Sequence, residues 1–117
     1  MSNKLNDHSL PPKSCSIDQL VTIEQDIQKV IDGKKVTTRR SGIYADIGEV
    51  MSLGEHQFVI EHIYSQRLGD MTNEDAQQEG YKDLEDYKKF ILSIHPGMKW
   101  SPQMKVWVHQ YEPVQTT

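Results

Sequence analysis

Four basic residues and two threonines occur together in the stretch Gly33-Lys34-Lys35-Val36-Thr37-Thr38-Arg39-Arg40, in a chain whose net charge is −4. An amphipathic segment precedes this stretch, and its second half is rich in β-branched residues. Glycine suits the left-handed position that follows a helix C-terminus, and valine and threonine favour a pleated strand. We therefore predict a helix that ends near Gly33, a tight turn, and a strand over residues 36–40.

The basic strand can carry chemistry because side chains alternate along a strand. Thr38 and Arg40 then share one face, and Thr37 and Arg39 share the other. Lys35 lies at the turn, where its long side chain can swing toward Thr38. A lysine, a hydroxyl and an arginine in this arrangement can bind an anion or activate a nucleophile. The alternative, which the spacing alone favours, is a solvated basic edge that protects the strand.

Composition limits the classes of protein that this chain can be. Its 117 residues suffice for one domain with a real core. The acidic balance argues against nucleic-acid binding through overall charge. It does not exclude binding at a local basic cleft formed by residues 33–40. The five histidines and the single cysteine, Cys15, form no paired zinc spacing. We expect neither a metal nor a cofactor.

The same composition suggests a compartment. No apolar run approaches membrane-spanning length, and the first residues lack the apolar core of a signal peptide. A lone thiol cannot form an internal disulfide, which fits a reducing environment. We expect a cytoplasmic monomer without membrane association.

The chain divides into one domain and two tails. Residues 1–15 are polar and contain two consecutive prolines, so we predict a disordered N-terminal tail. Residues 16–113 form the domain, and residues 114–117 form a C-terminal tail. In the domain, residues 17–21 are predicted to form a short first strand. Thr22 and Gln25 then fit a capping box for the first helix.

The second half of the domain mixes strands and helices. Strands are predicted over residues 47–53, 58–64 and 104–111, and in the second of these Phe58, Ile60 and His62 share one face. Short strands interrupted by three helices predict an α+β fold with a small curled sheet.

Two helices lie between these strands. Thr72 is a good N-cap for a short helix that stops near Gly80, and Asp83 caps a helix that runs to residue 94. Glu79 ends the short helix, where a negative charge is poorly placed with respect to the helix dipole. Such local violations are commonly tolerated surface residues, but they also occur at functional sites.

The order of these elements resembles the ASCH domain, a branch of the PUA-like β-barrels. The resemblance covers nearly the whole chain and rests on three segments: Gly33-x-Lys35-x-x-Thr38-x-Arg40 after a helix, Leu68-Gly69-Asp70-Met71-Thr72 leading into the helix that ends at Glu79-Gly80-Tyr81, and the closing strand Val106-Trp107-Val108-His109-Gln110-Tyr111-Glu112. It implies a small curled β-barrel with about three flanking helices.

The resemblance also implies two functions. Many members of the family are thought to bind RNA in a cleft beside the Gly-x-Lys motif. Small bacterial single-domain members hydrolyse the amide of N(4)-acetylcytidine to cytidine and acetate, with a lysine, a threonine and a glutamate held to be catalytic. These residues match Lys35, Thr38 and Glu79 of this chain.

Taken together, the resemblance implies a metal-free amidohydrolase acting on an N(4)-acylated cytidine or related nucleoside. Thr38 would be the nucleophile, Lys35 its base and Glu79 the acid/base, or Glu79 would activate a water while Thr38 only forms hydrogen bonds. Arg39 and Arg40 would bind the substrate or RNA. Tyr44 would either stack on a planar ligand or cover the barrel mouth.

Other readings stay open. Residues 41–46 differ from the pattern of the amidohydrolase branch, so the pocket accepts another acylated base, or none. The main alternative is a non-catalytic RNA-binding module that uses the same basic cleft. A third reading is a small-ligand sensor or interaction domain.

Overall fold

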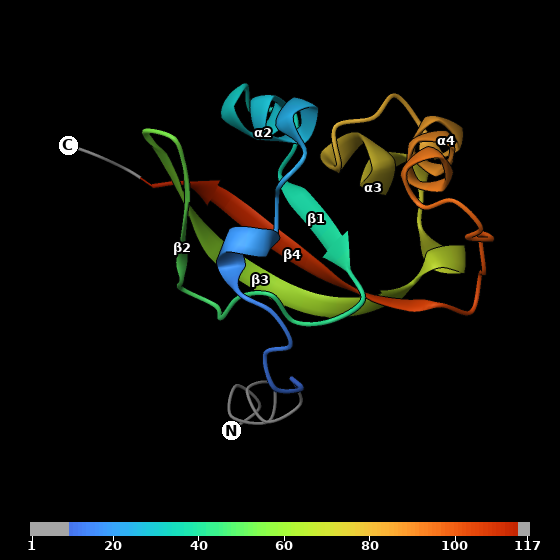
Figure 1. Cartoon of the computed structure of the whole chain (residues 1–117), viewed down its shortest axis with the longest axis horizontal. Coiled ribbons are helices and arrows are strands. Elements are labelled where there is room, and N and C mark those ends of the chain that lie inside the picture. Colours follow the sequence, from blue (N-terminus) through green and yellow to red (C-terminus); the bar gives the residue numbers. More distant parts are fainter. Residues whose placement is uncertain (1–9, 115–117) are drawn as a thin grey trace.

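The computed structural model describes residues 10–114, which form one antiparallel sheet flanked by three α-helices (Figure 1). The sheet is a curled half-barrel whose strand order is β1-β4-β3-β2. The strands are β1 (Thr37–Arg40), β2 (Val50–Leu53), β3 (His56–Arg67) and β4 (Lys105–Pro113). The predicted α+β class and curled sheet are confirmed.

The helices gather on one side of the sheet in Figure 1. They are α2 (Glu24–Ile31), α3 (Asn73–Gln78) and α4 (Leu84–Ile94), and two short 3-10 helices, η1 (Ile17–Gln19) and η2 (Leu68–Asp70), complete the described elements. None of the helices in residues 10–114 combines the length and the apolar character needed to cross a membrane.

The turn between α2 and β1 has the predicted form. Gly33 has a φ of 79°, which a side chain disfavours. The backbone N–H groups of Lys34 and Lys35 both donate to the carbonyl of Lys29, at 2.8 and 3.1 Å. The N–H of Val36 donates to the carbonyl of Gln78 at 2.7 Å. This turn therefore holds Lys35 between the end of α2 and the end of α3.

The start of the domain differs from the prediction. Residues 17–21 are not a strand, because the amide groups of Gln19 and Leu20 bond locally to the carbonyls of Ser16 and Ile17 and form η1. This turn buries Leu20 and Val21 in the core. Their apolar character, which suggested a strand, reflects burial at a turn.

The predicted capping box at Thr22 is also wrong. The N-cap of α2 is Ile23, and no side chain caps the helix there. The helix begins one residue too late for the Thr22 hydroxyl to serve as its cap. By contrast, Thr72 and Asp75 form a capping box at α3, and Asp83 caps α4, both as predicted at the cap position.

The face predicted for β3 fails at one position. The pairing of β3 with β4 shifts register between Ile60 and His62, which marks a bulge. An extra residue reverses the alternation of side chains beyond it. His62 is therefore exposed, and Ile63 is buried in its place.

Two hydrophobic clusters stabilise the domain. The larger one lies between the sheet, η1 and α2, and the smaller one comprises Met71, Ala76, Tyr81 and Tyr87 around α3 and α4. Residues from both clusters face the cavity described below.

The ends of the described chain contact the domain. Leu10 packs against the larger cluster, and the N–H of Ser14 donates to the carbonyl of Ile43 at 2.9 Å. The N–H of Val114 donates to the carbonyl of Gln57. Residues 10–14 of the predicted N-terminal tail thus lie on the domain, while residues 1–9 and 115–117 fall outside the described part.

Candidate functional site

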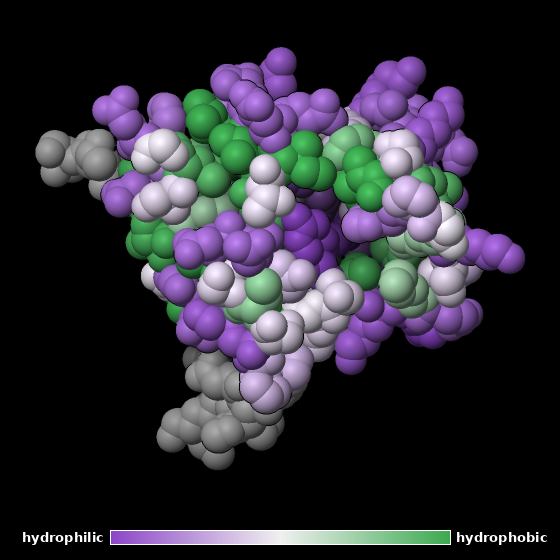
Figure 2. Space-filling model, in the orientation of Figure 1, coloured by the Kyte–Doolittle hydropathy of each residue, from purple (hydrophilic) through white to green (hydrophobic). Residues whose placement is uncertain are grey.

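A cavity of about 530 Å³ opens between α2, β1 and α4. Figure 2 shows the hollow on this face, with hydrophilic residues at its base and hydrophobic residues above it and to its right. Its polar wall includes Asp26, Lys35, Thr38, Arg39, Arg40 and Glu79, and its apolar wall includes Leu68, Phe90, Ile91, Ile94, Trp100 and Met104. Ligand pockets are commonly about 300–1,000 Å³ and mainly apolar, with a few polar groups.

Glu79 is the centre of the polar wall. It is the C-cap of α3 and only 2% exposed. Its Oε1 accepts a hydrogen bond from Lys35 Nζ at 2.8 Å, and its Oε2 accepts from Arg39 Nη1 at 2.7 Å and Thr37 Oγ1 at 3.2 Å. Two cations therefore compensate a carboxylate that is buried at the unfavourable end of a helix.

The strand alternation explains this cluster. Thr37 and Arg39 share the face that meets Glu79, as the period of two predicts. Lys35 joins them instead of turning toward Thr38, and it also donates to the backbone carbonyl of Glu79 at 3.3 Å. Lys35 is 3% exposed and Arg39 is 5% exposed. A solvated basic edge is therefore wrong for these two residues.

Gln66 and Asp75 hold Arg39 in place. Gln66 Oε1 accepts from Arg39 Nε at 3.0 Å and from Nη2 at 2.9 Å, and Gln66 Nε2 donates to Asp75 Oδ2 at 3.1 Å. Asp75 also lies 3.7 Å from Arg39 Nη2. Burial opposes the ionisation of Asp75, but hydrogen bonds from Thr72 and Gln66 and the nearby guanidinium lower its pKa overall. Asp75 and Gln66 thereby couple the start of α3 to the carboxylate at its end.

Thr38 reaches the cavity from the opposite face of β1. It is 2% exposed, and its hydroxyl lies 2.9 Å from the hydroxyl of Tyr111 on β4. Burial raises the pKa of Tyr111 above its ordinary value of 10.0, so this hydroxyl stays protonated and can donate to Thr38 Oγ1. The hydrogen of Thr38 is then available to another acceptor in the cavity.

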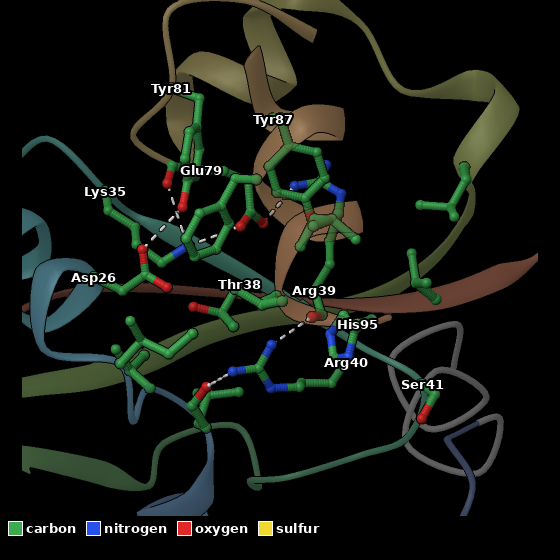
Figure 3. A pocket seen from close by; sticks show the side chains of 18 of the residues that line it. Asp26, Lys35, Thr38, Arg39, Arg40, Ser41, Glu79, Tyr81, Tyr87 and His95 are labelled. Carbon is green, nitrogen blue, oxygen red and sulfur yellow. Dashed lines mark hydrogen bonds and ion pairs between the residues drawn. The ribbon is translucent and has the colours of Figure 1, made fainter. Parts of the chain in front are cut away.

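Arg40 and Tyr44 border the cavity together. Arg40 Nη2 donates to the carbonyl of Leu20 at 2.6 Å, and its guanidinium carbon lies 5.8 Å from the centre of the Tyr44 ring. Figure 3 shows Arg40 below Thr38 in the pocket. The structure thus brings all six predicted site residues to the lining of one cavity, where Arg39 is buried and paired with Glu79.

His109 supports the loop that carries Tyr44. Its Nε2 accepts from the N–H of Tyr44 at 3.0 Å, so its proton resides on Nδ1, which lies 3.3 Å from the carbonyl of Thr38. Burial lowers the pKa of His109. The neutral ring is therefore a structural link between β4, β1 and the loop.

Several residues that line the cavity were not predicted from the sequence. Tyr81 donates to Asp26 Oδ1 at 3.0 Å, and Tyr87 closes the wall beside them. Asp26 had a detectable signal, because it occupies the same helical stripe as Ile23 and Val30, where an apolar residue is expected. Within residues 10–114, no group of three or more His, Cys, Asp or Glu side chains is arranged to hold a metal ion.

This curled sheet, its helices and the cleft between them define an ASCH-like fold. Two solved structures share it. One is the ASCH domain from Lactobacillus crispatus JV V101, with a TM-score of 0.59 and 11% identity over 77% of this chain and 70% of that one. The other is a DUF984 protein from Enterococcus faecalis V583, with a TM-score of 0.57 and 16% identity over 97% of this chain and 84% of that one. No protein-family model matches the chain, and no curated protein matches its sequence.

Proposed function

We propose that this protein is an amidohydrolase that acts on an N(4)-acylated cytidine or a related modified nucleoside. One observation carries the proposal: the buried Lys35–Glu79 pair, at 2.8 Å, faces the same cavity as the Thr38 hydroxyl. These three residues occupy the motif positions that the resemblance assigns to catalysis. The ASCH-like fold and a cavity large enough for a nucleoside support the assignment.

The first chemical step begins with the Lys35–Glu79 hydrogen bond. A proton passes from Lys35 Nζ to Glu79 Oε1, and the neutral amine, no longer ion-paired, turns toward Thr38 and accepts its proton. The Thr38 oxygen attacks the carbonyl carbon of the amide. The resulting oxyanion is stabilised by the positively charged Lys35 and by Arg40 at the same wall.

The second step releases the amine. The C–N bond breaks, and the departing nitrogen takes the proton held by Glu79. This restores the Lys35–Glu79 ion pair and leaves an acyl ester on Thr38. Water then attacks the ester by the same route, with Lys35 accepting its proton, and Thr38 regains its hydrogen as the carboxylic acid departs.

The contacts of Glu79 bear on the alternative mechanism. Both of its oxygens already accept hydrogen bonds from side chains, namely Lys35 on one and Arg39 and Thr37 on the other. A carboxylate so fully engaged is a poor base for a free water. This favours Thr38 as the nucleophile over direct activation of water by Glu79.

The burial of the basic residues bears on RNA binding. Phosphate contacts require cations that face solvent, whereas Lys35 and Arg39 are buried and paired with Glu79. A compact cavity and a net charge of −4 fit a small ligand better than a long polyanion. Should RNA bind, its affinity must fall steeply with salt.

A hydrolysis assay with N(4)-acetylcytidine tests the proposal. Loss of the acetylated base is followed by absorbance for the wild type and for Thr38→Val, Thr38→Ser, Lys35→Met and Lys34→Met. We expect activity to vanish in Thr38→Val and Lys35→Met and to persist in part in Thr38→Ser. The exposed Lys34 is the matched control for Lys35. No loss above the buffer rate for N(4)-acylated cytidines would overturn the proposal.

A further inference from the structure

One charged group of the cavity has no part in the proposed chemistry. Asp26 lies on α2, lines the cavity and is 8% exposed. A carboxylate this deeply buried is costly unless its oxygens are paired or meet a ligand. An apolar residue at this position of the stripe would pack without that cost.

Only one oxygen of Asp26 is engaged within residues 10–114. Oδ1 accepts from the Tyr81 hydroxyl at 3.0 Å, whereas Oδ2 accepts no hydrogen bond and has no cation within ion-pair distance. No fully enclosed side-chain nitrogen or oxygen of the described residues lacks a partner, so Oδ2 is not fully enclosed, and Asp26 lines the cavity. Burial, followed by the charge of Asp26, raises the pKa of Tyr81. Tyr81 therefore stays protonated and holds the carboxylate in this orientation.

Asp26 is also close to the residues proposed for chemistry. Figure 3 shows Asp26, Tyr81, Lys35 and Glu79 at one end of the cavity, with Ser41 and His95 toward the other. That end presents a hydrogen-bond donor, Lys35, and an acceptor, Asp26 Oδ2. A secondary amide bound between these two residues can satisfy both, because its carbonyl acceptor and its N–H donor point to opposite sides.

We infer that Asp26 is a specificity residue that accepts a hydrogen bond from the N–H group of the ligand. The inference rests on the proposed function and deepens it: substrates are secondary amides, and the amine released is bound through its own N–H. Amides and amines whose nitrogen carries no hydrogen are rejected, because on binding they cover Oδ2 without donating a hydrogen bond to it.

Binding of product-like nucleosides tests this without turnover. Calorimetry would compare the binding of cytidine, N(4)-methylcytidine and N(4),N(4)-dimethylcytidine to the wild-type protein, to Asp26→Asn and to Asp18→Asn. In Asp26→Asn, the remaining oxygen accepts from Tyr81 and the amide nitrogen faces the cavity, so an acceptor becomes a donor at the same volume. Asp18→Asn makes the same substitution at an exposed residue outside the cavity lining and is the matched control. Circular dichroism checks that each variant is folded.

The expected pattern of affinities distinguishes a hydrogen bond to Asp26 from a steric effect of the added methyl groups. In the wild type and in Asp18→Asn, the two nucleosides with an N–H bind about 10- to 100-fold more tightly than the dimethyl compound. In Asp26→Asn this preference disappears, whereas a purely steric preference would persist. The inference is overturned if the wild type has no preference, if Asp26→Asn retains it, or if no nucleoside binds.

The result is independent of the hydrolysis assay. A protein that binds with this preference but does not hydrolyse N(4)-acetylcytidine would refute the proposed function alone. A protein that hydrolyses the amide but shows no preference for N–H would refute the role of Asp26 alone.

Discussion

Thr37 and Arg39, two residues apart on β1, donate hydrogen bonds to the same oxygen of Glu79, at 3.2 and 2.7 Å. The second oxygen of that carboxylate accepts from Lys35. One short strand and the turn before it thus provide every side-chain donor that Glu79 receives within the described residues. The carboxylate is anchored from one direction by groups whose spacing the strand fixes.

The Arg39–Glu79 pair predicts a large loss of stability on removal of Arg39. Arg39→Met leaves Glu79 buried with one cation in place of two, and breaking a buried pair typically costs about 3–5 kcal/mol. Urea unfolding would measure the change in the free energy of unfolding. Arg67→Met, at an exposed arginine, is the control. Equal midpoints for the two variants would show that the pair contributes nothing to stability.

Gln66 predicts a smaller loss of the same kind. Gln66→Leu leaves two N–H groups of the Arg39 guanidinium without their acceptor, and an unpaired buried donor costs about 1–3 kcal/mol. The matched control is Gln103→Leu, because Gln103 is exposed and contacts Arg67 only at 3.4 Å. Denaturant unfolding of both variants checks the difference. A destabilisation of the same size at position 103 would contradict the prediction.

Gly80 predicts an effect on the site itself. Its φ is 92°, and an added Cβ would lie 2.9 Å from Lys29 Cδ and 3.3 Å from Lys35 Cβ. Gly97 has a similar φ of 87°, but an added Cβ would meet nothing within 4 Å. Gly80→Ala and Gly97→Ala therefore share the backbone strain, and only the first displaces Lys35.

We expect both alanine variants to lose about 1–2 kcal/mol of stability from the strained backbone. Only Gly80→Ala should also lower the turnover of N(4)-acetylcytidine, by about tenfold or more. Stability and activity measured together separate the two effects. Full activity in Gly80→Ala would mean that Lys35 tolerates the displacement.

His109 predicts a loss of stability in mild acid. Burial lowers its pKa in the folded protein, so below the ordinary value of 6.5 the unfolded chain binds more protons than the folded one. The contribution of the neutral ring is complete above pH 6.5 and is lost as the pH falls through the lowered folded value. Protonation of Nε2 would also break its hydrogen bond with the N–H of Tyr44.

His109→Gln provides the comparison for this pH dependence. The free energy of unfolding is measured by urea between pH 7.5 and pH 5 for both proteins. The wild type should lose stability more steeply than the variant, because His109 is the residue that differs between the two proteins. Parallel profiles would show that His109 is not the group that titrates.

A structural feature of this protein is predictable from the sequence when the interactions that form it join residues close together in the chain. The turn at Gly33 and the cap at Thr72 were predicted because their bonds join near neighbours. The bulge after Ile60 and the local turn at residues 17–21 were not, because pairing with β4 and burial in the core decide them. Periodicity carries no information on such long-range contacts.

The same distinction between local and long-range interactions applies to the candidate site. Resemblance brought Lys35, Thr38 and Glu79 into one prediction, but the sequence gives no distances, and the bonds of Lys35 go to Glu79 instead of Thr38. Gln66 left no signal, since a glutamine on a half-exposed strand is ordinary. Asp26 did leave a signal in the sequence, because it is a charged residue in the apolar stripe of a helix.

The central place of β4 in the sheet has a consequence for biosynthesis. Among the described strands, β1 pairs only with β4, which emerges last from the ribosome. Thr38 meets Tyr111 and the Tyr44 loop meets His109 only once that segment is available. A nascent chain lacking residues 105–113 therefore leaves the first strand without a neighbour, and the pocket acquires its shape after translation of the domain is complete.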